Sequence, residues 1–211
     1  MTKSESPIRK KVLAKARILF GRKGYSETTI KDIAIAYGSE PANIYNYFQS
    51  KEDILFNVLH EETQSLVSKI RFLKDDQESH PVEQIKKIFK VHGEVALGKM
   101  KPGKLIYDTE LMRLNKVHKN KLIELRDEYD EILRCIIIRG IRIGVFKDID
   151  IKIAAYAIAS TIMRLRVWYN PKGRLSKNEI ITSLWVFALR GLGCEEKYLV
   201  QDDMSPCLHE I

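Results

Sequence analysis

The sequence is poor in cysteine, proline and glycine, and it contains no long apolar run. Its 211 residues include three cysteines that lie far apart without a CxxC pair, so neither a disulfide framework nor a zinc site is expected. Six prolines and eleven glycines are too few for a fibrous or low-complexity chain. No apolar run approaches the roughly 18 to 20 residues of a membrane-spanning helix, and the N-terminus lacks the apolar segment of a signal peptide. These absences predict a globular cytoplasmic protein with no membrane partner.

Basic residues are in excess and are concentrated near the N-terminus. The formal net charge is +8, and residues 1–51 hold ten basic and four acidic residues, a net +6 of that total. A basic excess is typical of proteins that bind nucleic acids or anionic membranes, although a run of charge is often only a solvated helix face. The uneven distribution therefore indicates a small anion-binding domain attached to a larger, nearly neutral body.

Apolar residues recur with helical spacing along almost the whole chain, and no segment alternates as a strand does. Thr29 with Asp32 approximates a capping box, and Ser176 with Glu179 forms a full one. We predict an all-α fold of about nine helices, with an N-terminal three-helix helix-turn-helix domain and a helical ligand-binding and dimerisation domain. The expected division is residues 8–52, residues 53–195 and a loose polar tail at 196–211.

The longest predicted helices lie in the body. Ser50 precedes an acidic first turn and an apolar stripe from Ile54 to Leu73, which would reach roughly 30 Å and could join two parts of the molecule. Pro81 is expected to start the next helix. Further helices are expected around Leu105–Leu114 and over residues 119–143, 151–169 and 177–191.

A helix-turn-helix pattern surrounds Gly38. Ala34 is small where two helices would cross, Gly38 permits the bend, and Ile44 is spaced to pack the second helix on the first. Alone, this pattern also fits ordinary helical hairpins. Here a basic first helix precedes it, threonines open the second helix and aromatic residues lie on the third. These are the polar tips and phosphate donors that a DNA-reading helix needs.

The stretch ARILFGRKGYSETTIKDIAIAYGSEPANIYNYFQSKEDIL strongly resembles the N-terminal domain of the TetR family of bacterial transcriptional regulators. The resemblance implies that residues 28–36 and 41–47 form the helix-turn-helix and that the second segment enters the major groove. It also implies that Lys51 meets a phosphate at the start of the fourth helix. The expected DNA-binding residues are Thr28, Thr29, Lys31, Pro41, Ala42, Asn43, Tyr45, Asn46, Tyr47 and Lys51.

The turn departs from the family pattern. Where that pattern has V-S-x-G-T after the glycine, this sequence has Ser39, Glu40, Pro41, Ala42 and Asn43. Ser39 weakens the small core, and Glu40 places a negative charge near DNA. Asn43 keeps a polar tip that is competent to pair with adenine. The operator sequence therefore cannot be carried over from the family.

Two C-terminal stretches, residues 139–150 and 168–192, are similar to regulators of fatty-acid, sterol and aromatic-acid catabolism. Members of that group are commonly repressors released by acyl-CoA thioesters. The resemblance implies a four-helix dimer bundle built from helices 151–169 and 177–191 of each subunit, although these helices could simply complete a monomer core. The expected interface residues are Ala155, Ile158, Ala159, Ile162, Ile181, Leu184, Trp185 and Ala188.

The middle helices carry the candidates for an effector pocket. His92 lies on an apolar stripe and is either a satisfied core histidine or a ligand contact, and the same alternatives hold for the aromatic residues and methionines nearby. The candidates are His92, Tyr107, Met112, Tyr129, Ile136 and Met163.

Five arginines recur in otherwise apolar helices. They are either surface or salt-bridged residues, or a cluster that grips the phosphates of an acyl-CoA, for which the guanidinium group is well shaped. The five are Arg134, Arg139, Arg142, Arg164 and Arg166.

No catalytic pattern is recognisable, because the sequence has no G-x-S-x-G, no H-E-x-x-H and no Gly-rich phosphate loop. We therefore expect no enzymatic activity, no cofactor and no metal. The predicted function is that of a ligand-responsive regulator: a homodimeric repressor released from a palindromic operator by a small effector such as an acyl-CoA. Two alternatives stay open, namely a TetR-like regulator of an efflux pump that senses lipophilic drugs, and an all-helical enzyme or ligand carrier.

Overall fold

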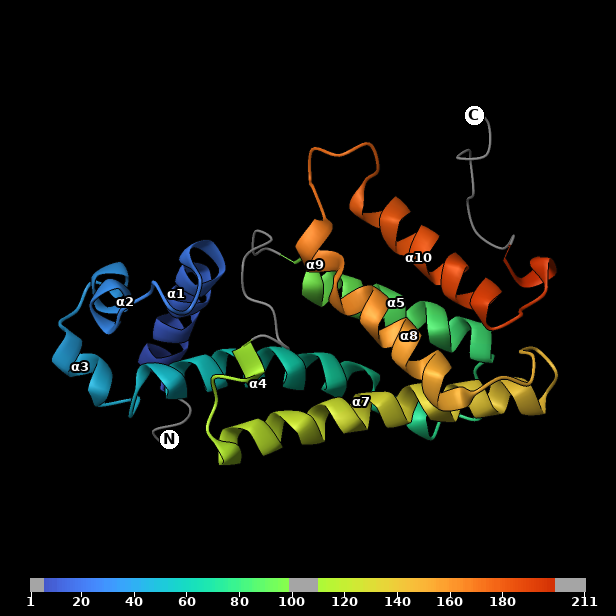
Figure 1. The fold of residues 1–211 in the computed structure, drawn as a ribbon, viewed down its shortest axis with the longest axis horizontal. Coiled ribbons are helices and arrows are strands. Elements are labelled where there is room, and N and C mark those ends of the chain that lie inside the picture. The colour runs from blue at the N-terminus through green and yellow to red at the C-terminus, as the bar shows by residue number, and fades with distance from the viewer. Residues whose placement is uncertain (1–5, 99–109, 200–211) are drawn as a thin grey trace.

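Every regular element in the computed structural model is helical, within the residues that the structure describes, 6–98 and 110–199. The predicted all-α class is confirmed. In Figure 1, three helices form one end of the molecule, and α4 extends from them into a body in which α7 runs alongside it. The elements are α1 (Pro7–Lys23), α2 (Ile30–Tyr37), α3 (Pro41–Tyr45), α4 (Lys51–Ile70), α5 (Pro81–Ala96), α7 (Lys116–Arg142), α8 (Ile151–Met163), α9 (Leu165–Trp168) and α10 (Lys177–Gly191), with 3-10 turns at Arg71–Lys74 and Glu196–Tyr198.

Side-chain caps fix where the main helices begin. The Thr29 hydroxyl accepts from the backbone of Asp32 at 3.0 Å, and the Asp32 carboxylate accepts from the backbone of Thr29 at 2.9 Å, so the predicted capping box is present. Ser176 and Glu179 form the second capping box at the start of α10. Ser50 caps α4 by accepting from the backbone of Asp53.

Two apolar cores share helix α4. The N-terminal core includes the first half of α4, from Ile54 to Leu59, together with Leu111, Leu114 and Leu122 from the start of the α7 region. The core of the body begins on α4 at Leu66 and continues through α5, α7, α8 and α10. The N-terminal core therefore extends past the predicted boundary at residue 52, because the first half of α4 is buried in it.

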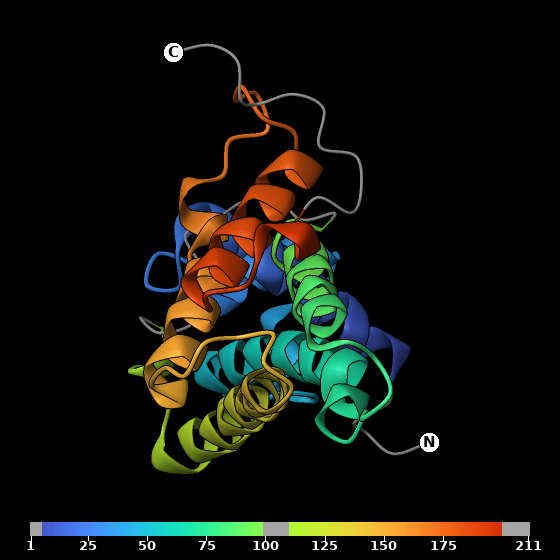
Figure 2. The ribbon, with the colours of Figure 1, turned by 90° about the vertical axis from the view of Figure 1, so that its right-hand side faces the viewer.

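The body is layered. In the end-on view of Figure 2, α4 and α7 lie below, α5 and α8 lie side by side above them, and α10 covers the top. Arg139 of α7 ties the lower layer to α5, because its guanidinium donates to the carbonyls of Leu73 and Lys74 in the turn after α4 and to the side chain of Gln84 in α5.

Some predicted elements differ from the structure. The third helix ends at Tyr45 instead of residue 47. The predicted helix 151–169 is interrupted at Arg164, following a turn in which the Thr161 hydroxyl bonds back to the Ala157 carbonyl, a contact that bends helices. The tail is not loose from its first residue, because Leu199 is buried in the body core. Residues 105–109 of the predicted short helix lie outside the described residues.

Candidate functional site

The turn between α2 and α3 has the geometry of a helix-turn-helix. Gly38 adopts φ +82°, which is the left-handed region, and its backbone N–H donates to the carbonyls of Ala34 and Ile35. The backbone of Ser39 donates to the Ala34 carbonyl as well. Ala34 and Ile44 are fully or almost fully buried, so the two helices are held at a fixed angle by the packing that the sequence predicts.

Helix α3 presents several of its side chains to solvent. Ala42, Asn43 and Asn46 are exposed, and Tyr45 is 56% exposed. Pro41 and Tyr47 are half-buried. Thr29 and Lys31 at the start of α2 are exposed too. The structure therefore brings most of the predicted DNA-binding side chains to the surface of the two helices.

Thr28 is an exception. Its side chain is fully buried, and its hydroxyl donates to the Gly24 carbonyl at 2.8 Å. The side chain of Thr28 supports the loop before α2 and is not available to a DNA phosphate. The neighbouring Thr29 has an exposed hydroxyl, since the capping box uses its oxygen only as an acceptor.

Lys51 is also engaged within the protein. Its ammonium group donates to the carbonyls of Tyr25 and Thr28, at 3.0 and 2.9 Å, and it lies 4.3 Å from the centre of the Tyr25 ring. Arg113 lies over the same ring at 5.5 Å. Lys51 thus ties the first turn of α4 to the loop between α1 and α2. The predicted phosphate contact would add to this structural role.

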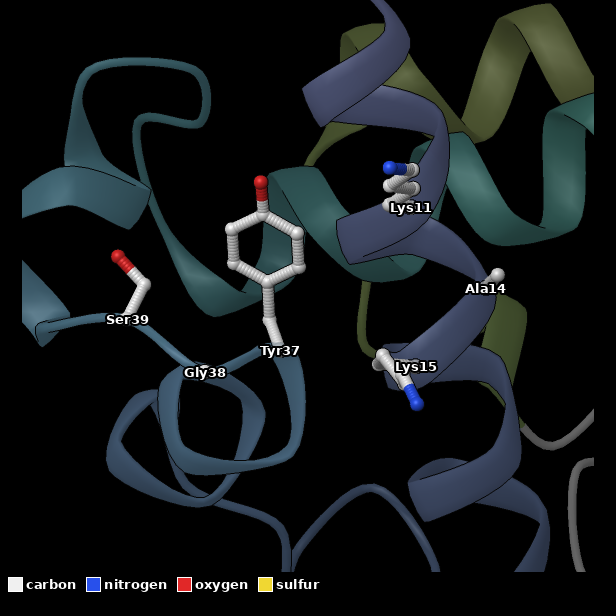
Figure 3. Close-up of a pocket in the computed structure, with 6 residues that line it drawn as sticks. All are labelled: Lys11, Ala14, Lys15, Tyr37, Gly38 and Ser39. Carbon is white, nitrogen blue, oxygen red and sulfur yellow. The ribbon is translucent and has the colours of Figure 1, made fainter.

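The basic face of α1 lies beside the turn. Lys10, Lys11 and Lys15 are exposed, and Lys11 and Lys15 line a surface hollow of about 520 Å³ together with Tyr37 and Ser39. Figure 3 shows Tyr37 between the turn and the two lysines of α1. Sequence reasoning did not single out Tyr37. Lys11 and Lys15 are four residues apart and therefore lie on the same face of α1. This spacing is the sequence signal that could have indicated a basic surface here.

The residues that depart from the family pattern lie in the turn and at the exposed start of α3. The Asn43 side-chain nitrogen donates to the Ser39 hydroxyl at 3.1 Å. Glu40 is exposed and precedes α3 with extended backbone. Ser39 therefore replaces an apolar contact by a hydrogen bond to a side chain on the exposed face.

A junction of polar and aromatic contacts joins this domain to α7. The carboxylate of Glu52 accepts from the backbone and the side chain of Asn115, both at 3.1 Å, and lies 2.9 Å from His118 Nδ1. The His118 ring stacks on Phe56 at 4.0 Å. Sequence reasoning missed this junction, because residues some sixty positions apart meet only in the folded chain.

In the body, His92 and Tyr129 form a buried polar pair. The His92 Nδ1 atom lies 3.0 Å from the Tyr129 hydroxyl, and both side chains belong to the core. Burial, reinforced by the charge of Arg166, lowers the pKa of His92 to about 3. Burial likewise raises the pKa of Tyr129. Both groups are therefore neutral, and His92 is a hydrogen-bonded core histidine.

The other pocket candidates differ widely in burial. Ile136 is fully buried, Met163 is half-buried, and Met112 is 75% exposed near the start of α7. Tyr107 lies outside the described residues. Met112 therefore does not line an interior pocket in this structure.

The arginines do not form one cluster either. Arg166 of α9 is half-buried, donates to the Ala96 carbonyl at 3.2 Å and forms an ion pair with Glu62 of α4. Arg139 is engaged at the end of α4, and Arg134 pairs with Glu131. Arg142 and Arg164 are exposed. Only Arg166 lies close enough to the buried pair to lower the pKa of His92.

The predicted interface residues face the inside of the chain. Ala155, Ile158 and Ile162 of α8 are at most 4% exposed. Helical spacing located the apolar stripe correctly, but this stripe packs on α5 and α7 of the same chain. Ala159, Ile181, Trp185 and Ala188 are buried as well, and Leu184 is half-buried.

A different set of apolar side chains is exposed on the same helices. Its members are between 46% and 70% exposed. We call this set the outer face, and it consists of Ile153, Tyr156, Val167, Trp168 and Phe187.

Two negative findings hold for the described part of the chain. No helix there is long and apolar enough to cross a membrane. No group of three or more His, Cys, Asp or Glu side chains there is placed to hold a metal ion.

Comparison with known proteins agrees with this geometry. Residues 12–58 match the family described as bacterial regulatory proteins, tetR family, and residues 78–192 match the tetracyclin repressor-like C-terminal domain. The transcriptional repressor KstR2 of Mycolicibacterium smegmatis is 27% identical over 186 residues, covering 87% of this chain and 90% of that protein.

Two further proteins extend the comparison. The fatty acid metabolism regulator protein of Bacillus subtilis is 25% identical over 162 residues, covering 76% of this chain and 82% of that protein. The structure of AibR in complex with isovaleryl coenzyme A and operator DNA has the same fold, with a TM-score of 0.73 and 18% identity over 85% of this chain and 97% of that one. Because the C-terminal match alone spans more than half of the sequence, the chain belongs to the tetR family of bacterial regulatory proteins.

Proposed function

We propose that this protein is a homodimeric transcriptional repressor that leaves its operator when its body binds a small acyl-CoA. The observation that carries the DNA-binding part is the surface of the helix-turn-helix. There α3 exposes Asn43, Tyr45 and Asn46, and the exposed Lys11 and Lys15 of α1 lie beside the turn that precedes it. Lysines suit the phosphate backbone and the side chains of α3 suit base edges, which is the division of labour in DNA recognition.

The body supports an effector with a neutral polar group. His92 and Tyr129 are uncharged, and together they offer hydrogen-bonding capacity inside an apolar core. The charged side chain that influences the pKa of His92 is the cation Arg166. This environment suits an acyl group with a thioester carbonyl and anionic phosphates better than a cationic drug. The fatty acid regulator and the acyl-CoA complex of AibR support the same class of effector.

Helix α4 gives a route from the body to the DNA-binding surface. Glu62 in the middle of α4 pairs with Arg166, which also holds the carbonyl of Ala96 at the end of α5. An effector that enters beside His92 would disturb Arg166 and thereby the position of α4. A dimer presents two recognition helices about 34 Å apart to successive major grooves, so a small shift of both α4 helices lowers the operator affinity. The coupling is reciprocal, and DNA weakens effector binding by the same factor.

The outer face supports the dimer. Five large apolar side chains on α8, α9 and α10 are exposed in the single chain, and a second copy of the same face would cover them with two-fold symmetry. We therefore propose an interface on the same helices as the sequence predicts, formed by different side chains of these helices.

Tyr45→Ala tests the DNA-binding surface. We expect it to weaken binding to a duplex selected from a random pool at least 10-fold. The thermal unfolding midpoint should stay unchanged, since Tyr45 is 56% exposed. Phe72→Ala is the matched control, because Phe72 is 57% exposed on the body. Fluorescence anisotropy with a labelled duplex measures both. Equal affinities of the two variants would contradict the assignment.

Tyr129→Phe tests the effector site. This change removes only the hydroxyl that meets His92, so we expect isovaleryl-, octanoyl- or palmitoyl-CoA to release the duplex at roughly 5- to 10-fold higher concentration, with operator affinity unchanged. Tyr198→Phe is the control, because the Tyr198 ring stacks on His80 away from this pair. The effector proposal fails if none of the three acyl-CoAs lowers the operator affinity of the unmodified protein.

Phe187→Glu tests the outer face. Phe187 is 70% exposed, so the single chain has no packing to lose. We expect a monomer at micromolar concentration in sedimentation velocity, whereas Phe72→Glu on the body leaves the dimer intact. A Phe187→Glu protein that sediments as the unmodified one does would place the interface elsewhere.

A further inference from the structure

The recognition surface carries no positive charge of its own. From Ser39 to Gln49 the sequence has no Lys and no Arg. The exposed side chains of this segment are instead neutral or acidic: Glu40, Ala42, Asn43, Tyr45, Asn46 and Gln49.

This composition disfavours guanine at the bases that α3 reads. In the major groove guanine presents two acceptors, N7 and O6, which are read best by Arg or Lys. The segment has neither Arg nor Lys. The carboxylate of Glu40 is itself an acceptor, so the N7 and O6 atoms of guanine would repel it. The nearby cations lie on α1 and at Lys31, where they suit phosphates.

Asn43 has the chemistry that adenine requires. Adenine presents an acceptor at N7 and a donor at N6, and an Asn amide meets both with one N–H and its oxygen. In this structure one Asn43 N–H is bound to the Ser39 hydroxyl at 3.1 Å. The second N–H and the amide oxygen have no partner in the described contacts and face solvent, which is the set that bidentate pairing needs.

Ser39 fixes the direction of that amide. Its backbone N–H is held by the Ala34 carbonyl at 2.9 Å, directly after Gly38 with its left-handed backbone. The serine is half-buried, whereas Asn43 is exposed. A hydrogen bond from a fixed turn to an exposed side chain restricts the rotamers of that side chain before DNA arrives, which lowers the entropy cost of pairing.

We infer that Asn43, oriented by Ser39, reads an adenine in each operator half-site. The methyl group of Ala42 suits the methyl group of thymine at an adjacent position. Ser39 is a positioning residue, since it acts through Asn43. This inference rests on the proposed DNA-binding function and specifies the bases that the protein reads.

Selection of duplexes from a random pool with the full-length protein tests the inference. We expect two-fold symmetric sites with one strongly preferred adenine per half-site. Asn43→Ala should lose the preference at that one position and bind the selected site on the order of 10-fold more weakly. Ser39→Ala should keep the adenine preference and lose a smaller factor. Asn120→Ala, an exposed asparagine on α7, is the matched control.

The outcomes separate the inference from the function on which it rests. Selected sites with guanine at the positions that respond to Asn43→Ala would overturn the adenine assignment while leaving DNA binding intact. The same holds if Asn43→Ala selects the same sites as the unmodified protein. Loss of binding in Ser39→Ala equal to that in Asn43→Ala, without unfolding, would overturn the positioning role. A pool with no enrichment over many rounds would overturn the DNA-binding function, and the inference with it.

Discussion

Helix α4 belongs to two apolar cores at once, and this is the constraint on which the rest of the structure depends. Its first half, from Ile54 to Leu59, is buried with α1 and α2, and its second half, from Leu66 onward, is buried with α5 and α7. A helix of 20 residues spans about 30 Å and resists bending. Neither end can move without moving the other or breaking one of the two cores. The DNA-binding surface and the body are therefore coupled by packing.

Polar contacts at the first turn of α4 strengthen this coupling. Lys51 binds the loop before α2 through two carbonyls, and Glu52 binds Asn115 and His118 at the start of α7. Two adjacent residues thus face opposite partners, one in the DNA-binding domain and one in the body. Leu111 and Leu114 complete the N-terminal core from the body side. The structural unit that carries the recognition helix is larger than a three-helix domain.

Local signals predicted much of this fold, and long-range contacts account for most of the errors. The capping boxes at Thr29 and Ser176 and the turn at Gly38 depend on residues a few positions apart, and all three are present. Helical spacing also located the apolar stripe of α8. Periodicity, however, gives a stripe without its partner. The resemblance implied a dimer bundle for Ala155 and Ile158, and in this structure both residues pack inside one chain, which was the alternative. Thr28 was expected to face DNA, but a local hydrogen bond to the Gly24 carbonyl buries its side chain. The bond from Lys51 to the Thr28 carbonyl joins residues 23 positions apart and could be known only from the folded chain. The contacts of DNA, effector and second subunit stay predictions.

Hydrogen exchange with and without a bound duplex tests the coupling through α4 most directly. A ligand that binds only the folded state slows exchange throughout the cooperative unit to which it binds. If α1 to α4 and the start of α7 form one unit, a saturating duplex slows the amides of residues 116–123 by the same factor as those of α2, and leaves those of α10 less affected. Slowing confined to α1, α2 and α3, with residues 116–123 unchanged, would contradict the account.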